Sequence, residues 1–273
     1  MPFAGINGIK LFYEVKGEGF PLFLLHGYGA TNEIWIGQKD PLSKHFKVIT
    51  YDSRSSGKSD HPNESFTLGD LVEDLKGLMD FLKIEKANII GQSMGGWVSQ
   101  NFALKYPNQV NKIVLLGTNH KGDGIDIFKN TMLDLYELSK TDKEQAYWKY
   151  AKLVHHRKYI KEMQTDTNKK FYGLWSAKDL MKEFNENLLT PIDYEHLSQA
   201  ISTHNVLNQL PQIKAPVLLI CASNDKLSPK IVMDEMHEKL LNSTLEIIND
   251  TAHHVFLEEA LKVNDLIINF LKK

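Results

Sequence analysis

The chain has 273 residues, of which 32 are basic and 34 acidic, and its formal net charge at pH 7 is −2. This length is enough for one large α/β domain with an insertion, and such a domain buries a sizeable core. The near balance of charge creates no general field that would attract a phosphate backbone or an anionic membrane. The composition therefore argues against nucleic acid and membrane surfaces as partners.

The first residues lack the basic and apolar regions of a secretory signal. No window approaches the roughly 18 apolar residues of a membrane-spanning helix. The single cysteine, Cys221, ends the apolar run "APVLLIC" and has no partner for an internal disulfide, so we expect it to pack as a small core residue. These features predict a reducing, cytoplasmic setting and leave the oligomeric state open between monomer and homodimer.

The first predicted elements are two antiparallel strands. Alternating apolar residues flank the pair Asn7-Gly8, which is the strongest short-range signal for a tight hairpin. Further along the chain, short runs of continuous apolar residues are typical of parallel strands covered on both faces. These predicted strands are residues 21–26, 47–52, 87–92, 112–118, 215–221 and 244–250.

Segments with the period of an α-helix alternate with these strands. Thr67 and Asp70 have the spacing of a capping box and predict the start of a helix. Alternation of strand and helix predicts a doubly wound, mostly parallel sheet with the antiparallel hairpin at one edge. The helices predicted for this layer are residues 67–84, 94–106, 229–241 and 257–271.

One interval interrupts this alternation. From about His120 to Leu210 the sequence contains helix-like stretches rich in aromatic residues and methionine, and no convincing strand. We predict an α/β core formed by residues 1–119 and 211–273, with a helical cap insertion at residues 120–210. The insertion holds 13 basic and 13 acidic residues, so its composition predicts no preference for a strongly charged ligand.

Ser93 lies in the segment Gly91-Gln92-Ser93-Met94-Gly95, which matches G-x-S-x-G directly after a predicted buried strand and before a predicted helix. Such a turn raises the hydroxyl above the carboxyl edge of the sheet, where ligands of open α/β sheets bind. The flanking glycines are needed because a Cβ at these positions would collide with the neighbouring strand or helix. The positive end of the following helix favours negative charge nearby. Ser93 is therefore a candidate nucleophile, although a glycine-rich turn with an incidental serine has the same local pattern.

A serine nucleophile needs a histidine base, held by a carboxylate, from other loops at the same sheet edge. Asp225 comes just after the predicted strand 215–221, and His253 and His254 come just after the predicted strand 244–250. The chain order serine, acid, histidine is the one expected for enzymes with this serine motif.

Five segments, "HGYG", "YDSRSSGKSD", "GQSMGG", "ASNDKLSP" and "TAHHVFLEE", occur in this order at the predicted strand ends. Together they resemble enzymes of the α/β-hydrolase superfamily, especially its small serine esterases, enol-lactonases and C–C hydrolases. The resemblance implies Ser93 as the nucleophile, Asp225 as the acid and His253 as the base. Some members carry the acid after an earlier strand, which makes Asp123 and Asp126 the alternatives to Asp225.

The resemblance also separates the two adjacent histidines. In such enzymes the catalytic histidine commonly precedes a glutamate by five positions, which fits His253 with Glu258 and leaves His254 one position short. We therefore expect His254 to lie at a helix start and to face away from Ser93.

The loop after the first parallel strand is implied by the resemblance to complete an oxyanion hole, with the backbone N–H groups of Tyr28 and Met94 as donors. His26 in this loop is predicted to be a hydrogen-bonded structural residue, and Arg54 is predicted to be a structural ion-pair partner.

The segment "DSRSSGKSD" departs from the family pattern D-x-R-G-x-G at Ser55, where glycine is typical. If this position requires a positive φ angle, Ser55 is strained by about 1 kcal/mol or more.

Aromatic residues of the cap, together with Tyr28 of the core, are the candidates for the substrate pocket. Tyr28, Trp148 and Trp175 are predicted to contribute apolar, aromatic walls, which favour an uncharged acyl or alcohol group of small to medium size.

The predicted function is a cofactor-free serine hydrolase that cleaves a small-molecule carboxylic ester or lactone through an acyl-enzyme. The same residues could cleave a vinylogous C–C bond or a thioester, and a ligand sensor that retains the triad is the alternative from another class.

Dehalogenases and epoxide hydrolases of this fold need a carboxylate where Ser93 stands. No nucleotide-binding glycine motif occurs, and His155-His156 lacks the companions of a zinc site, so neither a nucleotide cofactor nor a metal is predicted.

Overall fold

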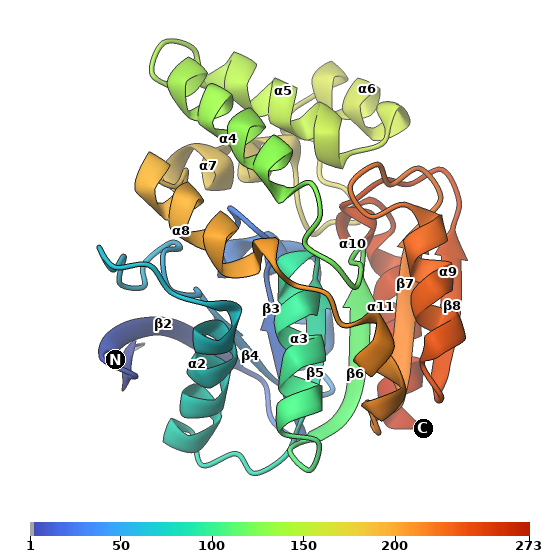
Figure 1. Ribbon diagram of the computed structural model, residues 1–273. Helices are drawn as coiled ribbons and strands as arrows, with labels where there is room; N and C mark the ends of the chain where they lie inside the picture. The colour runs from blue at the N-terminus through green and yellow to red at the C-terminus, as the bar shows by residue number, and fades with distance from the viewer. Residues whose placement is uncertain (1–2) are drawn as a thin grey trace.

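A single eight-stranded sheet forms the centre of the computed structural model, which describes residues 3–273 (Figure 1). The strand order is β1-β2-β4-β3-β5-β6-β7-β8. β1 pairs antiparallel with β2 and β2 with β4, whereas every pair from β4 to β8 is parallel. The predicted mostly parallel sheet with an antiparallel hairpin at one edge is confirmed. The strands are β1 Phe3–Ile6, β2 Ile9–Lys16, β3 Pro21–Leu25, β4 Lys47–Tyr51, β5 Ala87–Gln92, β6 Val110–Leu116, β7 Val217–Ala222 and β8 Ser243–Ile248.

The hairpin has the turn that its sequence predicts. Ile6 lies opposite Ile9, and the two residues between them, Asn7 and Gly8, have φ angles of 49° and 81°. Positive φ angles at both central positions define the turn type whose twist matches that of paired strands.

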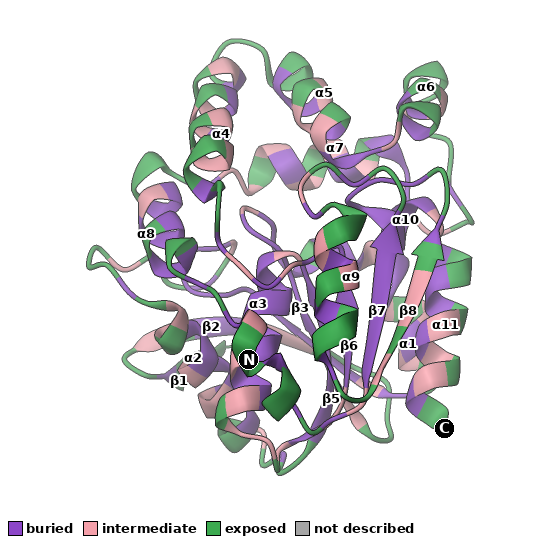
Figure 2. Cartoon of the chain, turned by 45° about the vertical axis from the view of Figure 1, so that its right-hand side comes forward, coloured by how far each residue is buried: buried purple, intermediate pink, exposed green. Residues whose placement is uncertain are grey.

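The parallel strands are buried on both faces, as their continuous apolar runs predict. β5 and β7 are buried along their whole length, whereas the edge strand β8 is only partly buried (Figure 2). Cys221 lies in β7 as a buried free thiol, which confirms its predicted place in the core.

Helices cover the two faces of the sheet. α2 begins at the predicted capping box of Thr67 and Asp70, in which each side chain accepts a hydrogen bond from the other residue's backbone N–H. α3 packs on β3, β5 and β6, and α9 packs on β7 and β8, both in front of the sheet in Figure 1, with α11 behind it. The elements of these layers are η1 Asn32–Gly37, α1 Lys39–Ser43, α2 Leu68–Phe81, α3 Met94–Lys105, η2 Leu207–Gln212, α9 Lys230–Lys239, α10 Val255–Glu258 and α11 Ala260–Lys272.

The prediction of one continuous helix over residues 257–271 is wrong at its start. α10 and α11 are separated by Glu259, whose φ of −124° and ψ of 49° are not helical. The carboxylate of Glu259 accepts a hydrogen bond from the hydroxyl of Tyr159, at 2.6 Å and 100 positions away in the chain. Such a long-range contact leaves no mark on the local periodicity.

Five helices between β6 and η2 lie over the carboxyl ends of the parallel strands (Figure 1). Within residues 3–273, no strand occurs between β6 and β7. Of the predicted boundaries, residue 120 falls between β6 and α4, and residue 210 falls inside η2. We call these five the cap helices: α4 Ile125–Ser139, α5 Lys143–Val154, α6 Arg157–Thr165, α7 Ala177–Glu186 and α8 Pro191–Ser202.

A search of residues 3–273 found no helix with the length and apolar character needed to cross a membrane.

Candidate active site

Ser93 occupies the turn between β5 and α3 with a strained backbone, at φ 50° and ψ −118°. Its N–H donates to Leu116 O at 3.1 Å, and its carbonyl oxygen accepts from Gly96 N at 2.8 Å and from Thr118 Oγ1 at 2.7 Å. Backbone strain of this kind persists only where the surroundings hold it. These three hydrogen bonds hold the Ser93 turn from both β6 and α3.

The glycines around Ser93 are required by close packing. A Cβ on Gly91 would lie 2.4 Å from the carbonyl oxygen of Gly95, and a Cβ on Gly95 would lie 2.2 Å from the carbonyl oxygen of Leu25. Both distances are far shorter than real contacts of a Cβ atom. The prediction that side chains would collide at these positions is confirmed. The close approach of α3 to the end of β3 depends on the glycine at position 95.

Asp225 and His253 meet at the ends of β7 and β8. His253 Nδ1 lies 2.8 Å from Asp225 Oδ2, and both residues are almost fully buried. The other carboxylate oxygen, Asp225 Oδ1, accepts from the N–H groups of Leu227 at 2.8 Å and Ser228 at 2.9 Å. The carboxylate is thereby fixed in place. In a neutral ring, the proton then sits on Nδ1 and leaves Nε2 as an acceptor.

Gly117 directly follows β6 and lies close to this pair. A Cβ on Gly117, which has a φ of 46°, would lie 3.4 Å from His253 Nδ1 and 3.2 Å from Asp225 Oδ2. The residues on either side of Gly117 hydrogen-bond to the backbone of Ser93. The three candidate residues therefore converge on the end of β6, although no hydrogen bond joins the Ser93 hydroxyl to His253 within residues 3–273.

The alternative acids lie elsewhere. Asp123 pairs with Lys121 at 3.0 Å and Asp126 pairs with Lys129 at 3.2 Å, and both carboxylates are largely exposed. Of these three aspartates, only Asp225 has a hydrogen bond to a histidine of the loop after β8 in the part of the chain that the structure describes.

His254 is buried and caps the start of α10, as predicted for a helix-start residue. Its N–H donates to Val154 O in the cap at 2.9 Å, and its ring centroid lies 4.9 Å from that of His155. Burial, with the nearby His155 ring, holds the pKa of His254 well below its usual value. Its ring therefore stays neutral in the folded protein.

The loop after β3 adjoins the Ser93 turn. A Cβ on Gly27 would lie 3.2 Å from Ser93 Cβ. Within residues 3–273, the backbone N–H groups of Tyr28 and Met94 donate to no acceptor. Two unpaired donors beside a serine hydroxyl are what an oxyanion hole requires.

His26 has the structural role that was predicted for it. Its Nδ1 lies 2.9 Å from the carbonyl oxygen of Gly27, and its Nε2 accepts from the N–H of Ser53 at 3.1 Å. Burial lowers the pKa of His26, so the ring is held in its neutral form.

A family model of the alpha/beta hydrolase fold matches residues 21–260. The chain belongs to the α/β-hydrolase superfamily. It is 26% identical over 272 residues to AB hydrolase superfamily protein YisY of Bacillus subtilis, which covers 96% of this chain and 95% of that protein. It is 27% identical over 274 residues to 2-hydroxy-6-oxo-6-phenylhexa-2,4-dienoate hydrolase of Comamonas testosteroni. This match covers 98% of this chain and 93% of that protein. The crystal structure of the enol-lactonase from Burkholderia xenovorans LB400 shares the fold with a TM-score of 0.85, at 24% identity and with 100% of both chains covered.

The aromatic residues proposed for the pocket of this α/β-hydrolase differ in their surroundings. The hydroxyl of Tyr28 donates to Tyr194 O at 2.9 Å, and the two rings stack with centroids 5.8 Å apart. Trp148 is half-buried on α5, and its N–H donates to a carboxylate one turn earlier. Trp175 is fully buried, with its N–H donated to Leu257 O at 3.1 Å, and so joins the cap to α10.

Glu258 has a role that the sequence did not reveal. Its fully buried carboxylate accepts from Ala252 N at 2.7 Å and from His156 N at 2.6 Å. It thus fastens the loop of His253 to the first residues of α6. The only sequence signal was its spacing from His253, which suggested a family pattern without a physical reason.

Glu183 on α7 was also missed. Its Oε1 accepts from the hydroxyl of Thr31, at 3.1 Å, in the segment that follows the predicted oxyanion loop. Burial raises the pKa of Glu183 to about 7, well above the usual range of a glutamate carboxyl group.

Proposed function

We propose that this α/β-hydrolase is a serine hydrolase that cleaves carboxylic esters or lactones of small to medium, mainly apolar substrates through an acyl-enzyme. The observation that carries the proposal is the convergence of a strained serine turn and a buried histidine–aspartate pair on the end of β6. A Cβ on Gly117 would lie 3.4 Å from His253 Nδ1, and the residues on either side of Gly117 hydrogen-bond to the backbone of Ser93. Nucleophilic catalysis requires an activated hydroxyl and an oriented base. This requirement explains why the serine, the histidine and the aspartate would lie together at the end of β6.

In the proposed first half-reaction, Ser93 Oγ attacks the substrate carbonyl carbon while His253 Nε2 accepts the hydroxyl proton. Asp225 keeps the imidazole oriented through the 2.8 Å contact to Nδ1 and stabilises the charged ring that forms. The N–H groups of Tyr28 and Met94 donate to the oxygen that becomes negative. His253 then passes the proton to the departing alcohol oxygen.

In the second half-reaction, water attacks the acyl-enzyme and His253 accepts its proton. The proton then returns to Ser93 Oγ as the acid product leaves. Hydrogen bonds between catalytic groups are often long without substrate and shorten in the substrate complex. Formation of the Ser93 to His253 hydrogen bond on substrate binding, beneath the cap helices, is therefore part of the proposal.

A second candidate is hydrolysis of a C–C bond by the same residues. The observation that favours it is the similarity to the Comamonas testosteroni enzyme, whose name specifies a 2-hydroxy-6-oxo-dienoate substrate. The same base and oxyanion donors would serve this reaction. The choice between the two depends on side chains of the cap.

The test is a substrate panel measured on the purified protein and on Ser93→Ala. It comprises p-nitrophenyl esters of increasing acyl length, lactones, thioesters and 2-hydroxy-6-oxo-6-phenylhexa-2,4-dienoate. Turnover of esters or lactones that disappears in Ser93→Ala supports the first candidate, and selective turnover of the dienoate supports the second. Ester turnover that is unchanged in Ser93→Ala would reject the assignment of the nucleophile.

A further inference from the structure

A groove lies outside the Ser93 turn, between the α5–α6 corner of the cap and the loops that carry Asp225 and His253. Its volume is about 770 Å³. Small-molecule sites commonly have volumes of roughly 300–1,000 Å³. One wall consists of cap residues between positions 152 and 164, and the other consists of residues near positions 224–226 and 250–252.

The two walls are held in a defined position relative to one another. Across the groove floor, His254 N donates to Val154 O at 2.9 Å and His156 N donates to Glu258 Oε1 at 2.6 Å. A further backbone hydrogen bond joins the loop after β7 to the loop after β8. The groove is therefore a built feature of the fold, because its shape depends on buried hydrogen bonds.

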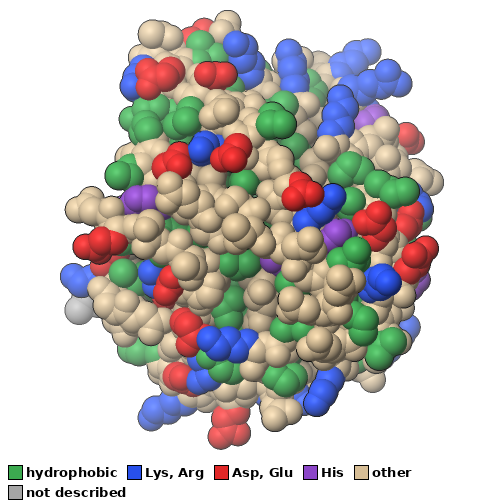
Figure 3. Space-filling view, viewed as in Figure 1, with side chains coloured by type: hydrophobic (Ala, Val, Ile, Leu, Met, Phe, Trp, Pro, Cys, Tyr) green, Lys and Arg blue, Asp and Glu red, His purple; other side chains and the backbone are tan. Residues whose placement is uncertain are grey.

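The lining of the groove is strongly cationic. It contains Lys152, Arg157, Lys161 and Lys226, against the single carboxylate of Asp250. Figure 3 shows Lys and Arg side chains gathered over α6, in the upper right of the view. Within residues 3–273, none of these four cationic side chains forms an ion pair or a hydrogen bond. Four unpaired cations on a concave surface focus a positive potential into it.

Two cations near the groove that do not line it are paired. Lys158 lies on α6 next to Arg157, and its Nζ lies 3.6 Å from Glu259 Oε1. Lys169, just beyond the end of α6, pairs with Glu162 at 2.5 Å. Within residues 3–273, these two cations beside the groove are paired, whereas the four that line it are not.

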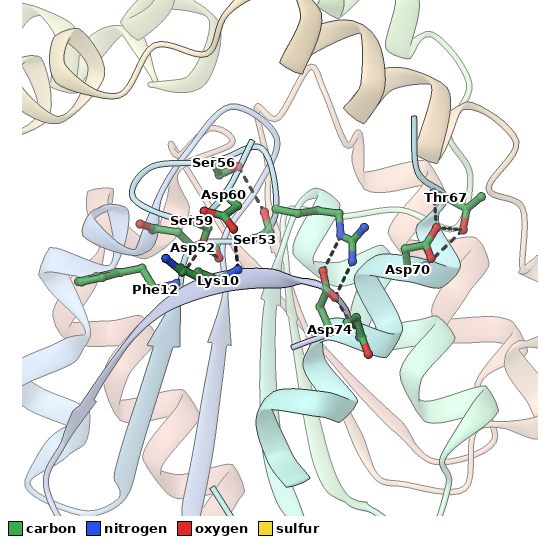
Figure 4. A network of polar contacts seen from close by, with 12 residues as sticks. Lys10, Phe12, Asp52, Ser53, Ser56, Ser59, Asp60, Thr67, Asp70 and Asp74 are labelled. Carbon is green, nitrogen blue, oxygen red and sulfur yellow. Dashed lines mark hydrogen bonds and ion pairs between the residues drawn. The ribbon is translucent and has the colours of Figure 1, made fainter. Parts of the chain in front are cut away.

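The two arginines of the chain are used differently. Arg54 forms a buried two-bond pair with Asp74, with donor to acceptor distances of 2.6 and 2.7 Å (Figure 4). Arg157 lines the groove without a protein partner in the described part of the chain. A guanidinium group matches the two oxygens of a carboxylate or phosphate group, which a lysine meets only as a point charge.

We propose that this groove binds an anionic small molecule that carries carboxylate or phosphate groups. Its concave shape and its volume suit a compact ligand, whereas the net charge of −2 provides no extended cationic track for a nucleic acid. The site goes beyond the proposed hydrolytic function, because Ser93 does not line it and binding requires no reaction.

The test is isothermal titration calorimetry of the intact protein with inorganic pyrophosphate and, separately, with citrate. The ionic strength is kept at about 0.15 M, where charges more than about 8 Å apart in solvent are largely screened. We expect saturable binding of at least one probe. We expect affinity at least tenfold lower in the double variant Arg157→Gln/Lys161→Gln.

The matched control is Lys158→Gln/Lys169→Gln, which removes the same charge from the same region outside the groove. We expect it to change affinity less than twofold. Lys226→Gln, on the opposite wall, is expected to weaken binding as well and tests the site if the first double variant does not fold. Binding of pyrophosphate alone would identify a phosphate ligand, and binding of citrate alone a carboxylate ligand.

The proposal is overturned if the wild-type protein binds neither probe, or if both double variants weaken binding equally. Binding of a single-stranded oligonucleotide in the absence of any binding of pyrophosphate or citrate would also overturn it. The calorimetric result does not depend on turnover, so it stands whether or not esters are substrates.

Discussion

Two serines of this α/β-hydrolase have positive φ angles, and their surroundings differ. Ser93 has a φ of 50° and lies half-buried at the carboxyl edge of the sheet. Ser55 has a φ of 59° and is completely buried. Its hydroxyl is buried without a hydrogen-bond partner within residues 3–273, whereas Ser93 lies at the sheet edge that also carries the Asp225–His253 pair. An unusual backbone angle therefore does not by itself identify a functional residue.

The loop of Ser55 is shaped by a network of structural hydrogen bonds (Figure 4). Asp52 accepts from the N–H of Lys58 at 2.9 Å, and Ser59 donates to the carbonyl oxygen of Asp52 at 2.5 Å while accepting from Phe12 N at 2.9 Å. The predicted structural role of Arg54 in this loop is confirmed by its pair with Asp74. The network ties the loop to β2, and Ser55 with its positive φ angle lies within this loop.

Ser93→Ala should reduce catalysis more than any other substitution considered for the two serines. Because the nucleophile is lost, kcat/KM for the best substrate of the panel should fall by more than about 10³-fold. Steady-state kinetics measure this change, and circular dichroism confirms that the variant is folded. Activity within tenfold of the wild type would show that the Ser93 turn is as purely structural as the Ser55 loop.

The two adjacent histidines provide the next test. His253→Ala should also lower kcat/KM by about 10³-fold or more, because the base is removed. His254→Ala should lower kcat/KM less than tenfold, while its lost packing costs about 2 kcal/mol of the free energy of unfolding. Kinetics and urea denaturation of both variants separate the two effects. The opposite ranking in kcat/KM would make His254 the base.

Gly95→Ala tests the close approach that holds the Ser93 turn. The new Cβ would lie 2.2 Å from Leu25 O, so we expect a loss of about 3 kcal/mol in the free energy of unfolding. Gly5→Ala is the control, because a Cβ there meets nothing within 4 Å, and its effect should stay within about 0.5 kcal/mol. Urea denaturation measures both. Equal stabilities would mean that the turn relaxes without cost.

The smallest expected effect is that of Ser55→Gly. Glycine adopts a positive φ angle without strain and removes a buried hydroxyl that has no partner, so the free energy of unfolding should rise by about 1 kcal/mol. The value of kcat/KM should not change. Ser93→Gly should bring a similar gain in stability together with loss of activity, which completes the comparison. A destabilised Ser55→Gly protein would show that the Ser55 side chain makes favourable contacts that outweigh its strain.

Features that depend on residues a few positions apart could be predicted from the sequence alone. Asn7-Gly8 specifies the hairpin turn, the capping box of Thr67 and Asp70 specifies the start of α2, and continuous apolar runs specify the buried strands. The glycines around Ser93 follow from the same local logic, because the turn leaves no space for a Cβ. Local backbone geometry and the burial of apolar residues are sufficient to encode all of these.

How remote segments meet is visible only in the folded protein. The hydrogen bond between Asp225 and His253 spans 28 positions, and that between Glu258 and His156 N spans 102. The break between α10 and α11 and the cationic groove also arise from such meetings. The equal numbers of basic and acidic residues in the cap predicted no charged site, because composition does not record which charges find partners. Contacts of this kind depend on how whole elements pack, and the packing follows from the complete fold and from no single stretch of sequence.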